Sequence, residues 1–152
     1  MSLISAGDLL ARLGDPALRI CDVRWWLADP GKGRCDYDAA HLPGAVFVDA
    51  DRDLVAVAGP GRHPLPSPAD FVARMEGCGV GEVSVVVAYD DAGGTIAARL
   101  WWMLDCISQV RISVLDGGLA AWTAIGGPLT AAVASYPAGR LTHRGGWTGT
   151  ID

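Results

Sequence analysis

Positive charge is scarce in this sequence of 152 residues, which contains a single lysine, Lys32. Lysine and arginine together number 12, against 17 aspartates and glutamates, and the formal net charge at pH 7 is −5. Proteins that bind nucleic acid usually offer a basic surface to the phosphate backbone. The charge balance therefore argues against nucleic acid as a partner.

Long hydrophobic runs are missing as well. A membrane-spanning helix needs roughly 18 or more consecutive apolar residues, and no run in the sequence approaches that length. The first residues, Met1 to Asp8, lack the basic and apolar regions of a signal peptide. We therefore expect no membrane partner and a cytoplasmic location.

Closely spaced cysteines are absent. No CxxC pair occurs, and no group of cysteine and histidine has the spacing of zinc ligands. The four cysteines are Cys21, Cys35, Cys78 and Cys106. Cys21 and Cys106 lie in apolar stretches, where cysteine usually behaves as a small buried hydrophobic residue. The sequence thus predicts reduced thiols and no metal site.

The residues that are present favour a folded α/β domain. Hydrophobic residues make up 51% of the chain and charged residues 19%, which is typical of a chain that forms a core. Short apolar runs alternate with stretches of helical composition, and this alternation predicts a mostly parallel sheet with helices on both faces. The predicted strands are residues 18–23, 45–49, 84–89 and 111–115, and the predicted helices are residues 6–13, 68–75, 96–107 and 119–125.

The loop after the third predicted strand is the strongest candidate for a site. It consists of Asp90, Asp91, Ala92, Gly93, Gly94 and Thr95. The glycines let backbone N–H groups converge above the start of a helix, and Thr95 can cap that helix. Such a cradle binds anions, and a cysteine at the first loop position would be held there as a thiolate. The residue at that position is Asp90.

Three interpretations of the loop stay open on residue chemistry alone. Asp90 and Asp91 can simply cap the next helix, because carboxylates are favourable at its positive end. They can also hold Mg²⁺ for phosphoryl transfer, although such sites usually need a lysine and Lys32 lies in a predicted loop. The loop can instead belong to a stand-alone module that binds an anion or a partner without turnover. The Mg²⁺ interpretation needs further carboxylates from other strand ends, and the candidates are Asp22, Asp49 and Asp116.

Five segments carry a resemblance to a known family. They are DVRWW (22–26), YDAAHLPGAV (37–46), VVVAYDDAGGT (85–95), AARLWWML (97–104) and VLDGGLAAW (114–122). In this order they resemble the rhodanese superfamily, and specifically the N-terminal domain of two-domain thiosulfate and 3-mercaptopyruvate sulfurtransferases. The resemblance implies a rhodanese-like three-layer α/β/α domain over residues 1–130. It also makes residues 131–152 a linker and the start of a second domain.

The resemblance implies sulfur transfer without metal or organic cofactor. Such proteins carry sulfane sulfur as a persulfide on a cysteine of the C-terminal domain and pass it to cyanide or a thiol. The matching position here is Asp90, and a carboxylate cannot form a persulfide. We therefore expect a domain that is inactive alone, with the C-terminal rhodanese domain as its partner and a small sulfur-containing anion as ligand of the intact protein.

Further residues receive roles from the same comparison of motifs. Trp25 and Trp26 are expected to form an interdomain wall of the pocket. His41 is expected to be a hydrogen-bonded structural residue, and Asp38 and Arg99 to position loops through charge-assisted hydrogen bonds. The remaining residues of the structural motif are Pro43, Gly44, Asp116, Gly117 and Gly118.

Overall fold

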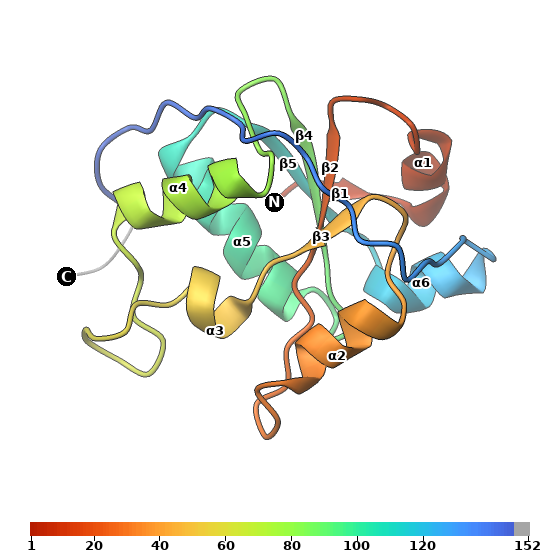
Figure 1. Ribbon diagram of the computed structural model, residues 1–152, viewed down its shortest axis with the longest axis horizontal. Helices are drawn as coiled ribbons and strands as arrows, with labels where there is room; N and C mark the ends of the chain where they lie inside the picture. The colour runs from red at the N-terminus through yellow and green to blue at the C-terminus, as the bar shows by residue number, and fades with distance from the viewer. Residues whose placement is uncertain (148–152) are drawn as a thin grey trace.

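The structure, a computed structural model, describes residues 1–147 as a parallel sheet between two layers of helices (Figure 1). The strands are β1 (Leu3–Ile4), β2 (Leu18–Asp22), β3 (Ala45–Phe47), β4 (Val85–Tyr89) and β5 (Arg111–Leu115). The helices are α1 (Ala6–Ala11), α2 (Lys32–Ala39), α3 (Ala50–Asp53), α4 (Pro68–Gly77), α5 (Thr95–Ile107) and α6 (Gly118–Ala124). The predicted α/β fold with a mostly parallel sheet is confirmed.

The strand order places the candidate loop at a topological switch point. The sheet has the order β1-β5-β4-β2-β3, and every pairing in it is parallel. The chain passes from β2 outward to β3 and then returns to β4 on the other side of β2. In open α/β sheets, ligands bind at the carboxyl ends of the strands beside such a reversal. The loops that follow β2 and β4 meet at this place.

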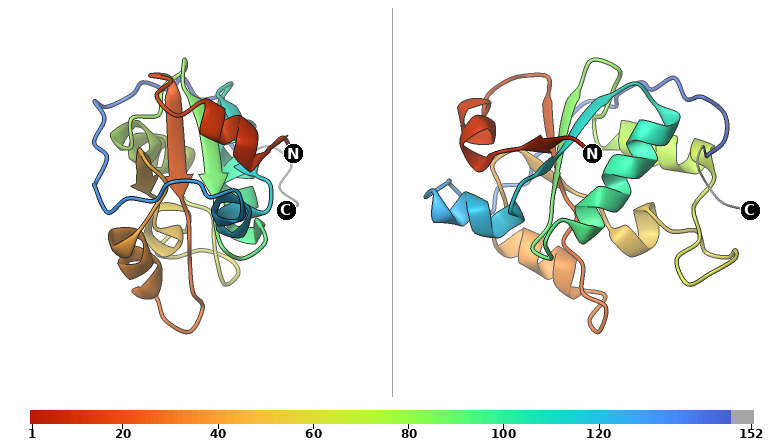
Figure 2. Two further views of the ribbon diagram at one scale, coloured as in Figure 1. Left: turned by 90° about the vertical axis from the view of Figure 1, so that its right-hand side faces the viewer. Right: turned by 180° about the vertical axis from the view of Figure 1, so that it is seen from behind.

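The strand residues alternate between two cores. Val86 and Ala88 of β4 pack into the cluster that faces α3, α4 and α5. Val87 and Tyr89 pack into the cluster that faces α1, α2 and α6. Because successive side chains of a strand point to opposite faces, a run of consecutive apolar residues suits a strand that is covered on both sides. Figure 2 shows these two helical layers around the sheet.

Three elements were not predicted from the sequence. They are β1, α2 and α3. The prediction that Lys32 lies in a loop is wrong, because Lys32 is the first residue of α2. This helix buries only Gly33 and Tyr37 and has a glycine at its N-cap without a side-chain hydrogen bond. It therefore shows neither a clear apolar stripe nor a start signal. Gly33 is needed for close packing, since a Cβ there would lie 2.1 Å from the Arg24 carbonyl oxygen.

The segment after α6 packs against the domain. Residues 130–147, which we call the C-terminal strap, contain no helix or regular strand and run back past β3 toward α4 (Figures 1 and 2). Tyr136 donates its hydroxyl to the Gly44 carbonyl and lies under the Arg19 guanidinium, 4.0 Å from the ring centroid. Leu141 is buried, and Trp147 stacks on Trp102. The prediction of an irregular segment is confirmed for its described part, but this part is a packed portion of the domain; residues 148–152 lie outside the described residues.

None of the helices within residues 1–147 combines the length and the apolar character that a membrane crossing requires.

Candidate functional site

The loop between β4 and α5 is built around the carboxylate of Asp90. This residue is completely buried. Its Oδ1 accepts hydrogen bonds from the backbone N–H groups of Ala92 (3.0 Å) and Gly94 (2.8 Å). Its Oδ2 accepts from the N–H groups of Ile96 and Ala97, both at 2.9 Å. The backbone thus forms the predicted anion cradle, and the anion within it is the side chain of Asp90.

This geometry decides between two predictions about the start of α5. The capping role is confirmed for Asp90, because its carboxylate receives N–H groups from the first turn of the helix. The prediction that Thr95 caps the helix is wrong. The N-cap is Gly94, with φ +85°, and the Thr95 hydroxyl donates instead to the Ala92 carbonyl. A left-handed backbone at this position requires glycine, so the internal carboxylate takes over the role of a capping side chain.

Asp91 lies outside the cradle. Its side chain is exposed, and the partial burial that remains raises the pKa of its carboxyl above the usual range. The neighbouring Arg24 lowers this pKa and so opposes the shift. Asp91 is therefore a surface carboxylate beside the site, and the capping role that was predicted for it is not observed.

A glycine turn closes the loop from the other side. The Leu119 N–H donates to the Asp90 carbonyl oxygen at 3.0 Å. Gly117 and Gly118 have φ of +75° and +57°. A Cβ at Gly118 would lie 2.5 Å from the Asp90 carbonyl oxygen. The turn at residues 116–118, which the sequence placed in the structural motif, therefore contacts the first residue of the cradle.

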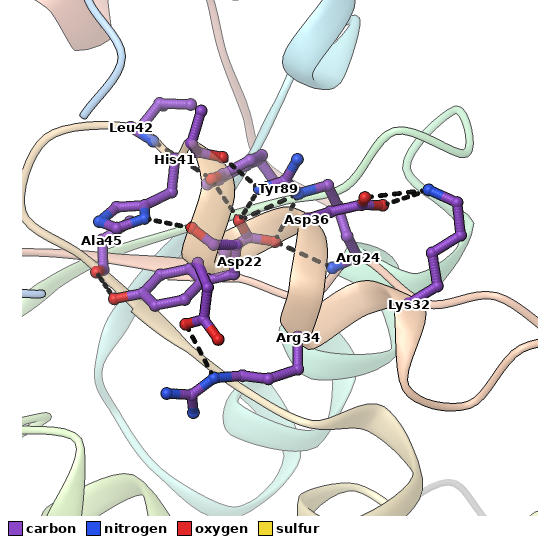
Figure 3. A network of polar contacts seen from close by, with 12 residues as sticks. Asp22, Arg24, Lys32, Arg34, Asp36, His41, Leu42, Ala45 and Tyr89 are labelled. Carbon is purple, nitrogen blue, oxygen red and sulfur yellow. Dashed lines mark hydrogen bonds and ion pairs between the residues drawn. The ribbon is translucent and has the colours of Figure 1, made fainter. Parts of the chain in front are cut away.

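A buried polar network lies beneath the loop after β2, and the sequence did not single out its members together. Asp22 and Arg24 form a buried ion pair at 2.7 Å, and the Tyr89 hydroxyl donates to the same carboxylate at 2.5 Å (Figure 3). Arg24 also donates to the Ala40 carbonyl, and the Leu42 N–H donates to the Tyr89 hydroxyl. The network therefore connects the ends of β2 and β4 with the segment that follows α2. Its signal in the sequence is a charged pair, Asp22 and Arg24, within an otherwise apolar stretch.

The network keeps Arg24 charged and Tyr89 protonated. Burial, followed by the Asp22 charge, raises the pKa of the Tyr89 phenol far above its ordinary value. Burial alone would lower the pKa of Arg24, but the hydrogen-bonded Asp22 carboxylate outweighs this effect and raises it. Arg24 therefore stays charged and Tyr89 stays a donor at neutral pH. Such groups fit a structural role better than a proton-transfer role.

Comparisons with known proteins match this architecture. A model of the rhodanese-like domain family matches residues 5–125. The chain belongs to the rhodanese family. A Pseudomonas aeruginosa protein named as a 3-mercaptopyruvate sulfurtransferase is 45% identical over 132 residues, which are 84% of this chain and 46% of that protein. A Mycobacterium tuberculosis protein named as a thiosulfate sulfurtransferase is 42% identical over 144 residues, 92% of this chain and 50% of that protein.

A solved structure shares the fold over nearly all of the chain. The 3-mercaptopyruvate sulfurtransferase from Leishmania major superposes with a TM-score of 0.88 and is 26% identical, covering 99% of this chain and 42% of that chain. The predicted rhodanese-like three-layer fold is confirmed. The rhodanese-like domain spans about half the length of the curated relatives it matches.

The two tryptophans after β2 occupy different settings in the rhodanese-like domain. Trp25 is half-buried, donates its Nε1–H to Asp51 at 2.8 Å and lies edge-on to His63. Trp26 is 39% exposed and is tied to α2, where its Nε1–H donates to Asp36 and Lys32 lies 4.4 Å from its ring centroid. Leu27, the next residue, is 59% exposed. The loop thus carries apolar surface next to the carboxyl edge of the sheet.

Asp38 and Arg99 differ in what they hold. Arg99 donates to the carbonyl oxygens of Leu54 and His63, and so joins the start of the loop between α3 and α4 to a later residue of the same loop. The prediction for Asp38 is wrong, because its carboxylate pairs with Arg34 one turn earlier on the same exposed helix face. Ion pairs between exposed side chains contribute little to the stability of the fold. Asp38 therefore positions no loop.

His41 is a buried structural histidine in the rhodanese-like domain. Its Nδ1 lies 2.6 Å from the Tyr37 carbonyl and its Nε2 lies 2.7 Å from the Ala132 carbonyl. Gly44, with φ +78°, accepts a hydrogen bond from Tyr136. The motif at residues 41–44 thus anchors the C-terminal strap rather than the loop at Asp90.

The carboxylates that the Mg²⁺ interpretation required do not converge. Asp22 is paired with Arg24, Asp49 caps α3, and Asp116 is exposed. Within residues 1–147, no group of three histidine, cysteine or acidic side chains could hold a metal ion. The carboxylate of Asp90 is already surrounded by four N–H donors.

Two of the cysteines are poorly suited to nucleophilic chemistry, because only the thiolate reacts. Burial raises the pKa of the Cys21 thiol far above its ordinary value. Burial, followed by the Asp53 charge, raises the pKa of Cys78 to about 11. Cys35 is exposed on α2 and Cys106 is half-buried on α5.

Proposed function

We propose that this chain is the catalytically inactive, N-terminal rhodanese-like domain of a two-domain thiosulfate or 3-mercaptopyruvate sulfurtransferase. The observation that carries the proposal is the buried Asp90 carboxylate, which accepts four backbone N–H groups where sulfur chemistry needs a thiolate. A carboxylate there can neither attack sulfane sulfur nor vacate the cradle for an anion. The role of this domain is then to support the catalytic second domain and to form one wall of its pocket.

The relatives indicate which reaction the intact protein performs. They are named for transfer from 3-mercaptopyruvate or thiosulfate, and this chain covers about half of each. With thiosulfate, a cysteine thiolate of the second domain takes the outer sulfur to give a persulfide and sulfite. Cyanide then removes that sulfur as thiocyanate and regenerates the thiolate. Neither step requires a group from the loop at residues 90–95.

Exposed apolar surface supports the second domain as the partner. Trp26 and Leu27 are 39% and 59% exposed in the loop after β2. This loop emerges at the carboxyl edge of the sheet, beside the end of β4. Apolar side chains grouped near a fold's functional edge commonly mark a binding surface. We assign this edge, with Trp25 behind it, to contact with the second domain.

A thiocyanate assay tests the inactivity directly. The purified chain is incubated with thiosulfate and cyanide, and thiocyanate formation is compared with the uncatalysed rate. We expect no acceleration from the unaltered chain. The Asp90→Cys variant is the comparator, because it places a thiol under the same N–H groups, which stabilise a thiolate. Thiocyanate formation by the unaltered chain above the uncatalysed rate would contradict the proposal.

The two remaining interpretations are tested by ligand-dependent melting. A ligand that binds the folded state raises Tm, and above its Kd the rise grows with the logarithm of the ligand concentration. We expect no shift with sulfate or thiosulfate, because Asp90 fills the cradle, and none with Mg²⁺ plus a phosphate mimic. A concentration-dependent rise in Tm that is lost in an Asp91→Asn variant would support the phosphoryl-transfer site instead.

A further inference from the structure

A second buried cluster lies where α2 meets the C-terminal strap. Its centre is His41, which is completely buried. Both ring nitrogens lie at hydrogen-bond distance from backbone carbonyl oxygens, Tyr37 at 2.6 Å and Ala132 at 2.7 Å. A carbonyl oxygen can only accept, and a neutral imidazole has one N–H and one lone pair. Only the doubly protonated imidazolium can donate to both oxygens.

The contacts of the ring suit a positive charge. The Tyr37 ring stacks on the imidazole with centroids 3.9 Å apart and an interplanar angle of 9°. Aromatic faces attract cations at such distances. The Tyr37 carbonyl also belongs to the last turn of α2, and the negative end of a helix favours a cation. Together these contacts offset the cost of burying a charged group.

Other charged groups occur on the elements that surround this cluster. On α2, the Arg34 guanidinium lies 5.7 Å from the Tyr37 ring centroid and pairs with Asp38. On the sheet side, Asp22 of β2 is paired with Arg24 and accepts the hydroxyl of Tyr89 from β4 (Figure 3). Arg24 and Tyr89 contact the backbone on either side of His41, at Ala40 and Leu42.

The strap contacts this cluster through its backbone. His41 and Thr130 exchange two backbone hydrogen bonds, both 2.9 Å long. The carbonyl oxygen of Ala132 also lies at hydrogen-bond distance from Nε2 of His41. Residues 131–133 are exposed and lie outside any helix or strand. The Tyr37 carbonyl belongs to a helix, whereas the Ala132 carbonyl lies in an exposed segment without helix or strand.

We propose that charged His41 clamps the C-terminal strap to the domain and that loss of one ring proton releases the strap at Ala132. A neutral ring would place a nitrogen lone pair against one of the two carbonyl oxygens, and Ala132, which no helix or strand holds, moves away. Histidine ordinarily changes charge between about pH 5 and 8. The strap is held while the ring carries both protons and is released once the ring is neutral. The clamp acts independently of the sulfur-transfer assignment, so either can fail without the other.

The protonation state of the ring is measured on the unaltered chain. Nitrogen-15 NMR of the histidine side chains distinguishes a ring with two N–H groups from either neutral tautomer. We expect His41 to carry two N–H groups at pH 5.5 and one at pH 9, with a perturbed Ala132 carbonyl resonance in the second state. A single N–H at pH 5.5 together with an unchanged Ala132 carbonyl across the series would overturn the proposal.

Amide hydrogen exchange reports whether the strap opens. The Thr130 N–H, which bonds to the His41 carbonyl, should lose roughly tenfold protection between pH 5.5 and 9 after correction for intrinsic exchange, as expected when one hydrogen bond is lost. His41→Gln should abolish this pH dependence. His143→Gln is the matched control, because His143 is exposed on the same strap. If the protection of the Thr130 N–H still depends on pH in His41→Gln, or no longer does so in His143→Gln, the clamp is contradicted.

Discussion

A single side chain determines what the loop after β4 can do. The N–H groups of Ala92, Gly94, Ile96 and Ala97 point at one position. The residue at that position decides whether the cradle holds a nucleophile, a free anion or an internal cap. Asp90 supplies the cap through four hydrogen bonds of 2.8 to 3.0 Å. The contacts that stabilise the loop therefore also prevent it from holding a nucleophile or a free anion.

Asp90→Ala tests how much the internal carboxylate stabilises the domain. Removal leaves four N–H groups without their partner, and each hydrogen bond to a charged group contributes more than a neutral one. We expect the free energy of unfolding in urea to fall by about 2 to 4 kcal/mol. Asp91→Ala is the control, since its exposed side chain lies outside the cradle, and its change should stay within about 0.5 kcal/mol. Equal effects of the two substitutions would show that the cradle does not depend on Asp90.

Residue chemistry predicted part of this site correctly. The glycines and the strand–loop–helix order indicated converging N–H groups, and a carboxylate at a helix start indicated capping. The sequence could not show which hydroxyl or carboxylate would fill the cap, because Thr95 and Asp90 are both suitable residue types. The choice depends on the left-handed Gly94, which shifts the N-cap away from Thr95.

At the scale of elements, the sheet ends are joined by the Asp22–Arg24–Tyr89 network. β2 and β4 are neighbours in the sheet, and the network continues from their ends to the segment after α2. The strands themselves were predictable from runs such as residues 84–89. By contrast, α2 was missed because its buried face consists of Gly33 and Tyr37 alone. Its position depends on contacts with Arg24, before the helix, and Ala45, after it, which a helical pattern within residues 32–39 cannot show.

Tyr89→Phe tests the network at alkaline pH. The folded state raises the pKa of Tyr89, so it holds the phenolic proton where the unfolded chain has released it. The stability from this shift is complete below about pH 10, the ordinary tyrosine pKa, and is lost as the pH rises beyond it. We expect Tyr89→Phe to be less stable at pH 7 by about 1 to 2 kcal/mol and to lose stability less steeply above pH 10. Urea unfolding at pH 7, 9, 10 and 11 measures both effects, and parallel pH profiles for the two proteins would contradict the assignment.

At the scale of the whole molecule, the domain extends beyond the last helix. The boundary predicted at residue 130 separates an α/β unit from a linker, but the strap contributes Leu141 to the core and Trp147 to an aromatic cluster with Trp102 and Phe71. The packing of the strap could not be predicted from the sequence, because the strap has no periodic pattern of apolar residues. Its contacts are made by single residues and by backbone groups, such as Gly139 N–H to the Glu76 carbonyl.

Truncation after residue 130 tests whether the strap belongs to the folding unit. The shortened chain loses the buried Leu141, the stacked aromatic residues and the partner of His41, so we expect the free energy of unfolding to fall by at least about 3 kcal/mol. Truncation after residue 147 is the control, because it keeps every contact of the strap described above. If the chain that ends at residue 130 unfolds at the same urea concentration as the full chain, the strap is only a linker.

The most direct test of an inactive domain is whether any atom of the chain accepts sulfur. The purified, reduced chain is incubated with thiosulfate, its intact mass is measured, and a portion is washed with cyanide to remove sulfane sulfur. The buried Asp90 carboxylate predicts an unchanged mass before and after the wash. A gain of one sulfur atom that cyanide removes would place a working nucleophile on one of the four cysteines, and would contradict the assignment of Asp90 as the occupant of the catalytic position.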